Sequence, residues 1–306
     1  MKIAVESIRK ASSAIGGTPS SYLRSRVLAR GQGWRVSDVI CSAGPGARPV
    51  EEQHSSACIA IVRSGSFQYQ SSIGRELMAP GSLMLGNAGQ YFECGHEHGV
   101  GDCCISFSYE PQFVEGLAAE AGLRLRSVRF NSLRLPPTRE LSGVAARAFA
   151  GMLRSKQPTE DAHATEYWEE IALELAVRSL EYANTAASHA TSLAAEARVT
   201  RIVRMINANA AAKHELATLA QDARLSRYHF LRLFQQLTGL TPHQYVLRSR
   251  LRHAAVQLLI RPQAILDIAF NSGFNDVSNF NHAFRAEFGV SPKVYRRRTQ
   301  PGFKAA

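Results

Sequence analysis

The chain has 306 residues, 45% of them hydrophobic and 20% charged, and a formal net charge of +11. This length is enough for two or three domains with buried cores. No stretch approaches the roughly 20 apolar residues of a transmembrane helix, and the first residues lack the apolar run of a signal peptide. We therefore expect a cytoplasmic protein with no membrane partner.

The positive charge is confined to the C-terminal part of the chain. Residues 196–306 hold 17 lysines and arginines against 6 aspartates and glutamates, whereas residues 1–195 hold 19 of each sign. A domain with this balance attracts polyanions, and its affinity for them falls steeply as salt rises. A solvated basic surface would explain the excess of positive charge, but it would not explain why this excess is confined to one segment.

The cysteines show the opposite distribution, since all of them precede residue 105. An odd number without paired CxxC spacing argues against a disulfide framework and for a reducing compartment. The five residues are Cys41, Cys58, Cys94, Cys103 and Cys104.

The N-terminal part predicts a small β-structure. Residues 1–21 are small and polar and contain glycine, so we expect a flexible arm. Residues 22–130 consist of short alternating or apolar runs broken by glycine turns, which is typical of a barrel or jelly roll able to hold a ligand. The predicted strands are 34–40, 57–62, 66–70, 82–85 and 104–107.

Residues 131–184 are expected to be mainly helical. After Pro136 the pattern changes to two long segments rich in alanine and leucine, 138–156 and 161–184. Amphipathic helices that follow a barrel can simply cover it. Residues 185–195 are small and polar, as expected of a linker.

Cys94, His96 and His98 form a cluster with metal-binding chemistry. On one strand these alternate residues would share a face, and a thiolate with two imidazoles suits zinc or copper. The surrounding sequence is rich in glycine and charge, so we favour a loop whose side chains contact water. We therefore assign no metal and no cofactor. Cys103 and Cys104 are either oxidant sensors or inert core thiols.

The basic segment contains two helix-turn-helix patterns. In the first, apolar residues at helical spacing mark a helix near 216–223, and Ser226 is placed to cap a second helix. The buried side of that second helix includes Phe230 and Phe234. A long helix over 241–259 then connects the first unit to the next.

The second unit spans 265–298. Gly273 permits a turn between two short helices, and the later helix repeats Phe280, Phe284 and Phe288 on one face. The opposite face offers hydrogen-bonding side chains, a composition suited to reading base edges. This face consists of Ser278, Asn279, Asn281, His282 and Arg285.

The ends of this later helix are also marked. Asp276 is placed to cap its beginning and Gly289 to end it. Pro292 is expected to prevent the helix from resuming.

This segment resembles the signature of AraC/XylS-type transcription regulators, in which Ala-x-x-x-Gly-Phe, a polar run and Phe-x-x-x-Phe precede Gly-x-x-Pro-x-x-Tyr-Arg. Spacing and residue types both match, which a lone helix-turn-helix pattern would not provide. The similarity continues upstream to about Leu216. The matching residues are Ala269, Gly273, Phe274, Phe280, Phe284, Phe288, Gly289, Pro292, Tyr295 and Arg296.

The resemblance implies an α+β fold, with an N-terminal cupin-like β-barrel with helices and an all-α C-terminal double helix-turn-helix domain. It implies a cupin-like sensor domain over 22–130, dimerisation through helices of 131–184 and an AraC-type DNA-binding domain over 196–306. The expected partners are double-stranded promoter DNA, RNA polymerase, an unidentified small-molecule effector and a second copy of the chain. The resemblance favours activation over repression.

The cupin resemblance also allows a test for the metal site of cupin enzymes. With Gly65 closing the first cupin motif, the ligand positions fall on Glu52, His54 and Cys58, and Phe92 stands where the third histidine belongs. Only His54 matches. The departure implies that the cupin metal centre is absent, as a sensor of an organic effector would allow.

The resemblance places base-facing residues on both recognition helices, which two rigidly joined units can insert into groove segments about 34 Å apart. Arg232 suits a bidentate contact to guanine, Asn279 or Asn281 suits adenine, and Tyr228 and Leu231 suit thymine methyl groups. Ser278 is also expected to face the bases, and Ser226, Arg227 and Arg285 are expected to contact phosphates. His282 would read a base, contact a phosphate or simply be exposed, and we favour the phosphate contact.

We therefore expect a sequence-specific, effector-responsive transcription regulator. The sequence shows no Ser/His/Asp or paired-carboxylate constellation, so we do not expect an enzyme. The alternative is a metal- or redox-active cupin-like protein with chemistry at His54, Cys94, His96 and His98, and with DNA binding secondary. A nonspecific nucleic-acid binder is a third interpretation.

Overall fold

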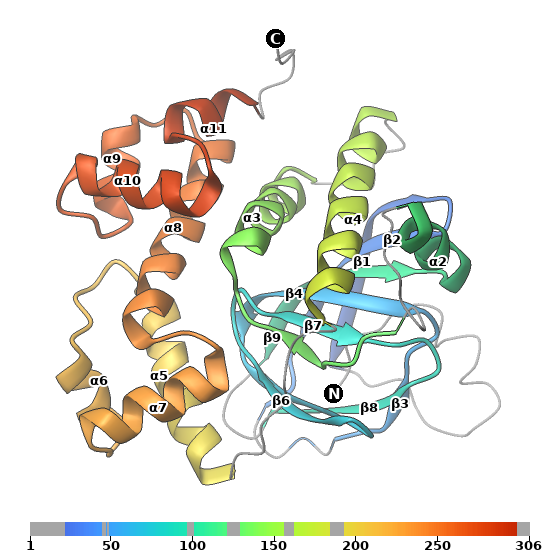
Figure 1. Ribbon diagram of the computed structural model, residues 1–306, viewed down its shortest axis with the longest axis horizontal. Helices are drawn as coiled ribbons and strands as arrows, with labels where there is room; N and C mark the ends of the chain where they lie inside the picture. The colour runs from blue at the N-terminus through green and yellow to red at the C-terminus, as the bar shows by residue number, and fades with distance from the viewer. Residues whose placement is uncertain are drawn as a thin grey trace.

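The computed structural model describes residues 22–44, 47, 49–96, 101–120, 129–155, 162–183 and 193–298. Within these ranges, two β-sheets and three helices form an N-terminal domain, and seven helices form a C-terminal domain (Figure 1). The expected arm at 1–21 lies outside the described residues. So does most of the expected linker, and residues 193–195 begin a helix instead.

The N-terminal domain contains two antiparallel sheets. One has six strands in the order β1-β2-β9-β4-β7-β10, and the other has four in the order β3-β8-β5-β6. All five predicted strands are confirmed, with boundaries that differ by a few residues. The strands are β1 Leu23–Gly31, β2 Trp34–Cys41, β3 Glu52–Gln53, β4 Ala57–Gly65, β5 Phe67–Ser71, β6 Gly74–Met78, β7 Leu83–Gly86, β8 Tyr91–Gly95, β9 Asp102–Tyr109 and β10 Arg134–Leu135.

The six-stranded sheet is buried on both faces. One face, which includes Ala60 and Val62 of β4, packs against the four-stranded sheet through residues such as Phe92. The other face, which includes Ile59 and Ile61, packs under the helices. This double burial explains why β4 is a continuous apolar run rather than an alternating pattern.

Three helices accompany the sheets: α2 Pro111–Glu120, α3 Arg139–Arg154 and α4 Ala162–Ala183. The last two confirm the predicted helices, whereas α2 was not predicted. Trp168 of α4 is buried near Phe107 of β9, with 6.3 Å between ring centroids, so α4 covers the sheet.

The C-terminal domain is all-helical, as predicted. Both helix-turn-helix patterns are confirmed, and the long helix between them ends at Ile260, one residue later than expected. The helices are α5 Leu193–Ala208, α6 Leu216–Asp222, α7 Arg227–Thr238, α8 Pro242–Ile260, α9 Ile265–Asn271, α10 Val277–Phe288 and α11 Pro292–Arg298.

The prediction that Pro292 prevents further helix is wrong. Pro292 is the first residue of α11. Proline is accommodated at this position because the first N–H groups of a helix have no partner within it. Gly289 ends α10 as predicted, with a left-handed backbone at φ 75°.

The two domains pack directly against each other. Leu77 of β6 and Ala79, which directly follows β6, join the core of the first helix-turn-helix unit. Ala146 and Ala150 of α3 join the core of the second unit. The α3 helix therefore lies between the six-stranded sheet and the C-terminal domain (Figure 1). In the part of the chain that is described, no helix is both long and apolar enough to cross a membrane.

Candidate functional site

The two helices that the sequence predicts as recognition helices, α7 and α10, begin at side-chain caps. The Ser226 hydroxyl accepts a hydrogen bond from the His229 backbone N–H at 3.3 Å. The Asp276 carboxylate accepts from the backbone N–H groups of Ser278 at 3.1 Å and Asn279 at 2.9 Å. These bonds lower the pKa of Asp276 because they stabilise its charged form. Both predicted caps are confirmed.

Each recognition helix separates an aromatic core face from an exposed polar face. Phe230 and Phe234 of α7 are fully buried, as are Phe280 and Phe284 of α10. Leu231 is half-buried. The predicted contact residues whose side chains are exposed are Ser226, Arg227, Arg232, Ser278, Asn279, Asn281, His282 and Arg285.

Two further residues of α7 bear on its exposed polar face. Tyr228 lies in α7, but its side chain falls outside what the structure describes. Gln235 is exposed one turn after Arg232 and was not predicted, although its i+3 spacing places it on the same face. It extends the hydrogen-bonding surface of α7.

The α8 helix connects the two units rigidly. It begins with a capping box, in which the Thr241 hydroxyl accepts from the Gln244 N–H and the Gln244 side chain accepts from the Thr241 N–H. At 1.5 Å per residue, its 19 residues span about 28 Å. Figure 1 shows α7 near the beginning of α8 and α10 near its end.

Comparisons with known proteins match this helical region. A sequence profile described as a helix-turn-helix domain matches residues 219–298. These residues form an AraC-type domain. The probable transcriptional regulator LumQ of Photobacterium leiognathi is 39% identical over 84 residues, which cover 28% of this chain and 34% of LumQ. The transcriptional regulator Rob of Salmonella typhimurium is 34% identical over 85 residues, covering 28% of this chain and 29% of Rob.

Among solved structures, a transcriptional regulator with an AraC-type DNA-binding domain from Chromobacterium violaceum is 28% identical. The alignment covers 36% of this chain and all of that one, with a TM-score of 0.33. The similarity to LumQ and Rob spans about a third of each protein's length.

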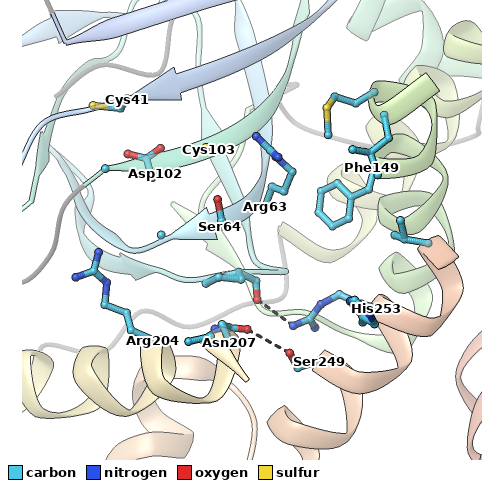
Figure 2. Close-up of a pocket in the computed structure, with 18 of the residues that line it drawn as sticks. Cys41, Arg63, Ser64, Asp102, Cys103, Phe149, Arg204, Asn207, Ser249 and His253 are labelled. Carbon is cyan, nitrogen blue, oxygen red and sulfur yellow. Dashed lines mark hydrogen bonds between the residues drawn. The ribbon is translucent and has the colours of Figure 1, made fainter. Parts of the chain in front are cut away.

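A cavity of about 690 Å³ lies where the AraC-type domain meets the N-terminal domain (Figure 2). Strand ends of the six-stranded sheet, α3, α5 and α8 all contribute to its lining. One part of the wall is apolar, with Phe149, Met152 and Val256, and another carries the guanidinium groups of Arg63 and Arg252. The cavity therefore offers both apolar contact and positive charge.

Arg252 is the cavity residue with the most unusual environment. It is 7% exposed, and its Nη2 donates to the Pro80 carbonyl at 3.3 Å. Its Nη1 is buried with no hydrogen-bond partner among the described residues. Arginine stays protonated, so this is a buried positive charge with an unused donor. A charged residue between the buried Leu251 and Ala254 was the signal that sequence reasoning overlooked.

In the part of the chain that the structure describes, the residues at the cupin ligand positions are not grouped as metal ligands. His54 is buried, its Nε2 lies 2.8 Å from the Tyr69 hydroxyl, and its ring stacks on Phe92 at 4.1 Å. Burial lowers the pKa of His54 to about 3 and raises the pKa of Cys58 to about 11. Both groups are neutral at pH 7, as core residues.

The cluster predicted at 94–98 is only partly described, because His98 lies outside the described residues. The interpretation of this stretch as a water-exposed loop is wrong for Cys94 and His96, which are 1% and 3% exposed. His96 Nε2 lies 2.6 Å from Asp102 Oδ2. Ligand-type atoms of Cys41, His96 and Asp102 lie within 4.8 Å of one another, and Cys94 is not in this group.

Proposed function

We propose that this protein is a sequence-specific, effector-responsive transcription regulator of the AraC/XylS type. The observation that carries the proposal is the pair of capped helices, α7 and α10, which expose polar faces from an AraC-type domain. The net charge of +11 carried by residues 196–306 supplies attraction to DNA phosphates. LumQ and Rob, both named as transcriptional regulators, support the same function.

The contact roles follow from side-chain chemistry. Arg232 would pair with guanine, and Asn279 or Asn281 with adenine. The exposed Ser226, Arg227, His282 and Arg285 would bind phosphates and fix the orientation of the domain.

The N-terminal domain would be the cupin-like sensor, and RNA polymerase and promoter DNA would be the partners of an activating homodimer. The dimer contact would use the surface of α4 that faces away from the sheet. This surface is acidic, with exposed Glu166, Glu169, Glu170 and Glu181, so it would need basic groups from the second copy.

Substitution of Arg232 tests the DNA-reading role. Full-length protein would first select a preferred site from random duplexes. Arg232→Ala should then weaken binding to that site by about 1–3 kcal/mol, roughly 5- to 150-fold, and weaken binding to random DNA much less. The matched control is Arg30→Ala, which removes an exposed charge from β1. Equal losses on both DNAs for Arg232→Ala would refute base reading.

The effector would bind in the cavity between the domains, and its chemistry follows from the lining. The unused Arg252 Nη1 favours an anionic group, as does Arg63, which lines the same cavity and lies 3.8 Å from Asp38. Phe149, Met152 and Val256 favour an apolar body. A ligand here would contact both domains at once. It would therefore favour one arrangement of sensor and DNA-binding domain over another.

Matched pairs of ligands test this assignment. Small carboxylic acids and their primary amides have similar shapes, but only the acids carry charge. In thermal-shift titrations, acids that bind should stabilise the wild type and Arg250→Met more than their amides do. Arg252→Met should lose this preference. Arg250 is the control because it donates to Ala210 and Ala212 carbonyls within its own domain. Equal stabilisation by acids and amides would contradict an anion site.

The redox alternative is not favoured by the environment of the thiols. Burial raises the pKa of Cys94 and of Cys104 well above the ordinary thiol value, which suppresses the reactive thiolate. Metal binding by the N-terminal domain has geometric support, but at residues other than those of the cupin pattern.

A further inference from the structure

Three strands bring Cys41, His96 and Asp102 together at one end of the N-terminal domain. Cys41 is the last residue of β2 and Asp102 the first of β9, and they are directly paired across the sheet. His96 immediately follows β8 of the other sheet. The cluster therefore bridges the two sheets, and its three residues are 2%, 3% and 3% exposed.

The hydrogen bonds within the cluster leave one ring nitrogen of His96 unused. Nε2 lies 2.6 Å from Asp102 Oδ2, and Nδ1 is buried without a hydrogen-bond partner among the described residues. The ring of Phe67 stacks on the imidazole at 5.8 Å and limits its rotation. The Cys41 sulfur accepts from the Ala43 N–H at 3.3 Å.

Burying a carboxylate, an imidazole and a thiol together is costly unless something compensates them. Removing ionisable groups from water costs several kcal/mol per charge in typical proteins. A cation would compensate the carboxylate and thiolate, and the ligand-type atoms already lie within 4.8 Å of one another. Ligands of tetrahedral zinc lie roughly 3.3–3.7 Å apart, given bonds of about 2.0–2.3 Å. Only small side-chain movements would be required.

We propose that Cys41, His96 and Asp102 bind a transition-metal ion of the zinc class, with one coordination position open toward the cavity. Sulfur and imidazole nitrogen select zinc-like ions over magnesium or calcium, which prefer oxygen ligands. Cys41 and Asp102 both line the cavity (Figure 2). Three protein ligands with a fourth position for an exogenous ligand form an open site, unlike the closed four-ligand sites that serve structure alone.

The open position has a consequence for the cavity. A ligand anion held there would contact the metal on the side of the N-terminal domain, while Arg252 lies on α8 of the AraC-type domain. The metal site itself does not depend on the proposed function, because it is defined by the N-terminal domain alone. Its test therefore requires no DNA and no effector.

Metal titration of untagged, chelator-treated, full-length protein tests the proposal. Zn²⁺ should bind at about one equivalent per chain, and Co²⁺ should produce a thiolate-to-metal charge-transfer absorption. Cys41→Ser should abolish that absorption. His96→Gln and Asp102→Asn should each weaken Zn²⁺ binding roughly tenfold or more. The matched control, Cys58→Ser, removes a buried thiol on β4 that bonds Ser106 instead, and should bind like the wild type.

Several outcomes would overturn the proposal. One is the absence of stoichiometric Zn²⁺ binding by the wild type, a measurement that does not depend on the folding of any variant. Others are retention of the Co²⁺ absorption by Cys41→Ser and equal loss of binding in Cys58→Ser. Far-UV circular dichroism without metal would establish that His96→Gln and Asp102→Asn remain folded when their affinities are compared.

Discussion

Arg252 of α8 donates to the carbonyl of Pro80, which lies in the turn between β6 and β7, at 3.3 Å. The hydroxyl of Tyr245 donates to the same carbonyl, also at 3.3 Å. The guanidinium carbon of Arg252 lies 5.9 Å from the Tyr245 ring centroid. One backbone carbonyl of the N-terminal domain therefore anchors two side chains of the helix that joins the helix-turn-helix units. A movement of this turn would be transmitted directly to α8.

Gly81 leaves space for the Arg252 guanidinium, so replacing Gly81 should weaken the hydrogen bond between Arg252 and Pro80. A Cβ at Gly81 would lie 2.7 Å from the Arg252 guanidinium carbon, whereas a Cβ at Gly89 would have no neighbour within 4 Å. Both glycines have positive φ, at 91° and 75°, so alanine strains the backbone at each. Gly81→Ala should therefore lower the free energy of unfolding by about 1 kcal/mol more than Gly89→Ala does. This difference is the typical contribution of one hydrogen bond to stability.

Making both glycine substitutions in the Arg252→Ala variant separates the effect of the lost Arg252 contact from the effect of backbone strain. In that background the difference between Gly81→Ala and Gly89→Ala in urea unfolding should disappear, because the obstructed side chain is gone. A difference that persists unchanged would show that the extra cost at Gly81 arises elsewhere.

The helix-turn-helix units could be predicted from the sequence because their signals are local. Ser226 and Asp276 cap N–H groups two or three residues away, and Gly289 ends the helix it follows. Pro292 was misinterpreted because the same residue that interrupts a helix also begins one well. The missed α2 carried a similar signal, since it too begins with a proline, Pro111.

The cluster of Cys41, His96 and Asp102 could not be predicted in the same way. Cys41 and Asp102 are 61 positions apart, and only the pairing of β2 with β9 places them opposite each other. The register of that pairing depends on the whole hydrophobic pattern of the sheet. The glycine and charge around His96 gave no information about its burial.

The second helix-turn-helix unit depends on the aromatic core around Phe284. This ring is fully buried, with centroids 5.5 Å from Phe280, 4.4 Å from Phe288 and 5.2 Å from Tyr295. Phe284→Ala should lower the free energy of unfolding by about 3–5 kcal/mol. Phe270→Ala is the matched control, because Phe270 of α9 is 48% exposed, and it should cost about 1 kcal/mol or less.

The positions of the tryptophans allow the two domains to be followed separately in this experiment. Both tryptophans, Trp34 and Trp168, lie in the N-terminal domain. In urea, Phe284→Ala should lose helical circular dichroism at lower concentration than it loses native tryptophan fluorescence. Coincident transitions that both shift would instead show that the two domains unfold as one unit.

His54 should make the stability of the N-terminal domain depend on pH. Burial lowers the pKa of His54 in the folded chain to about 3, from an ordinary value of 6.5. Between these values the unfolded chain binds the proton and the folded chain does not, so the free energy of unfolding falls as pH falls below about 6.5. The loss between pH 7.5 and pH 5 should be about 2 kcal/mol, measured by urea unfolding followed by tryptophan fluorescence.

Replacement of His54 by glutamine distinguishes this residue from other titrating groups. His54→Gln should remove about 2 kcal/mol from the change in stability between the two pH values, whatever its effect on stability at pH 7.5. His214→Gln is the control, because His214 is only half-buried and bonds the Asn209 carbonyl in the C-terminal domain. It should leave the pH dependence of the fluorescence transition unchanged. If His54→Gln retained the full wild-type pH dependence, another group would be responsible, and burial would not keep the His54 imidazole neutral.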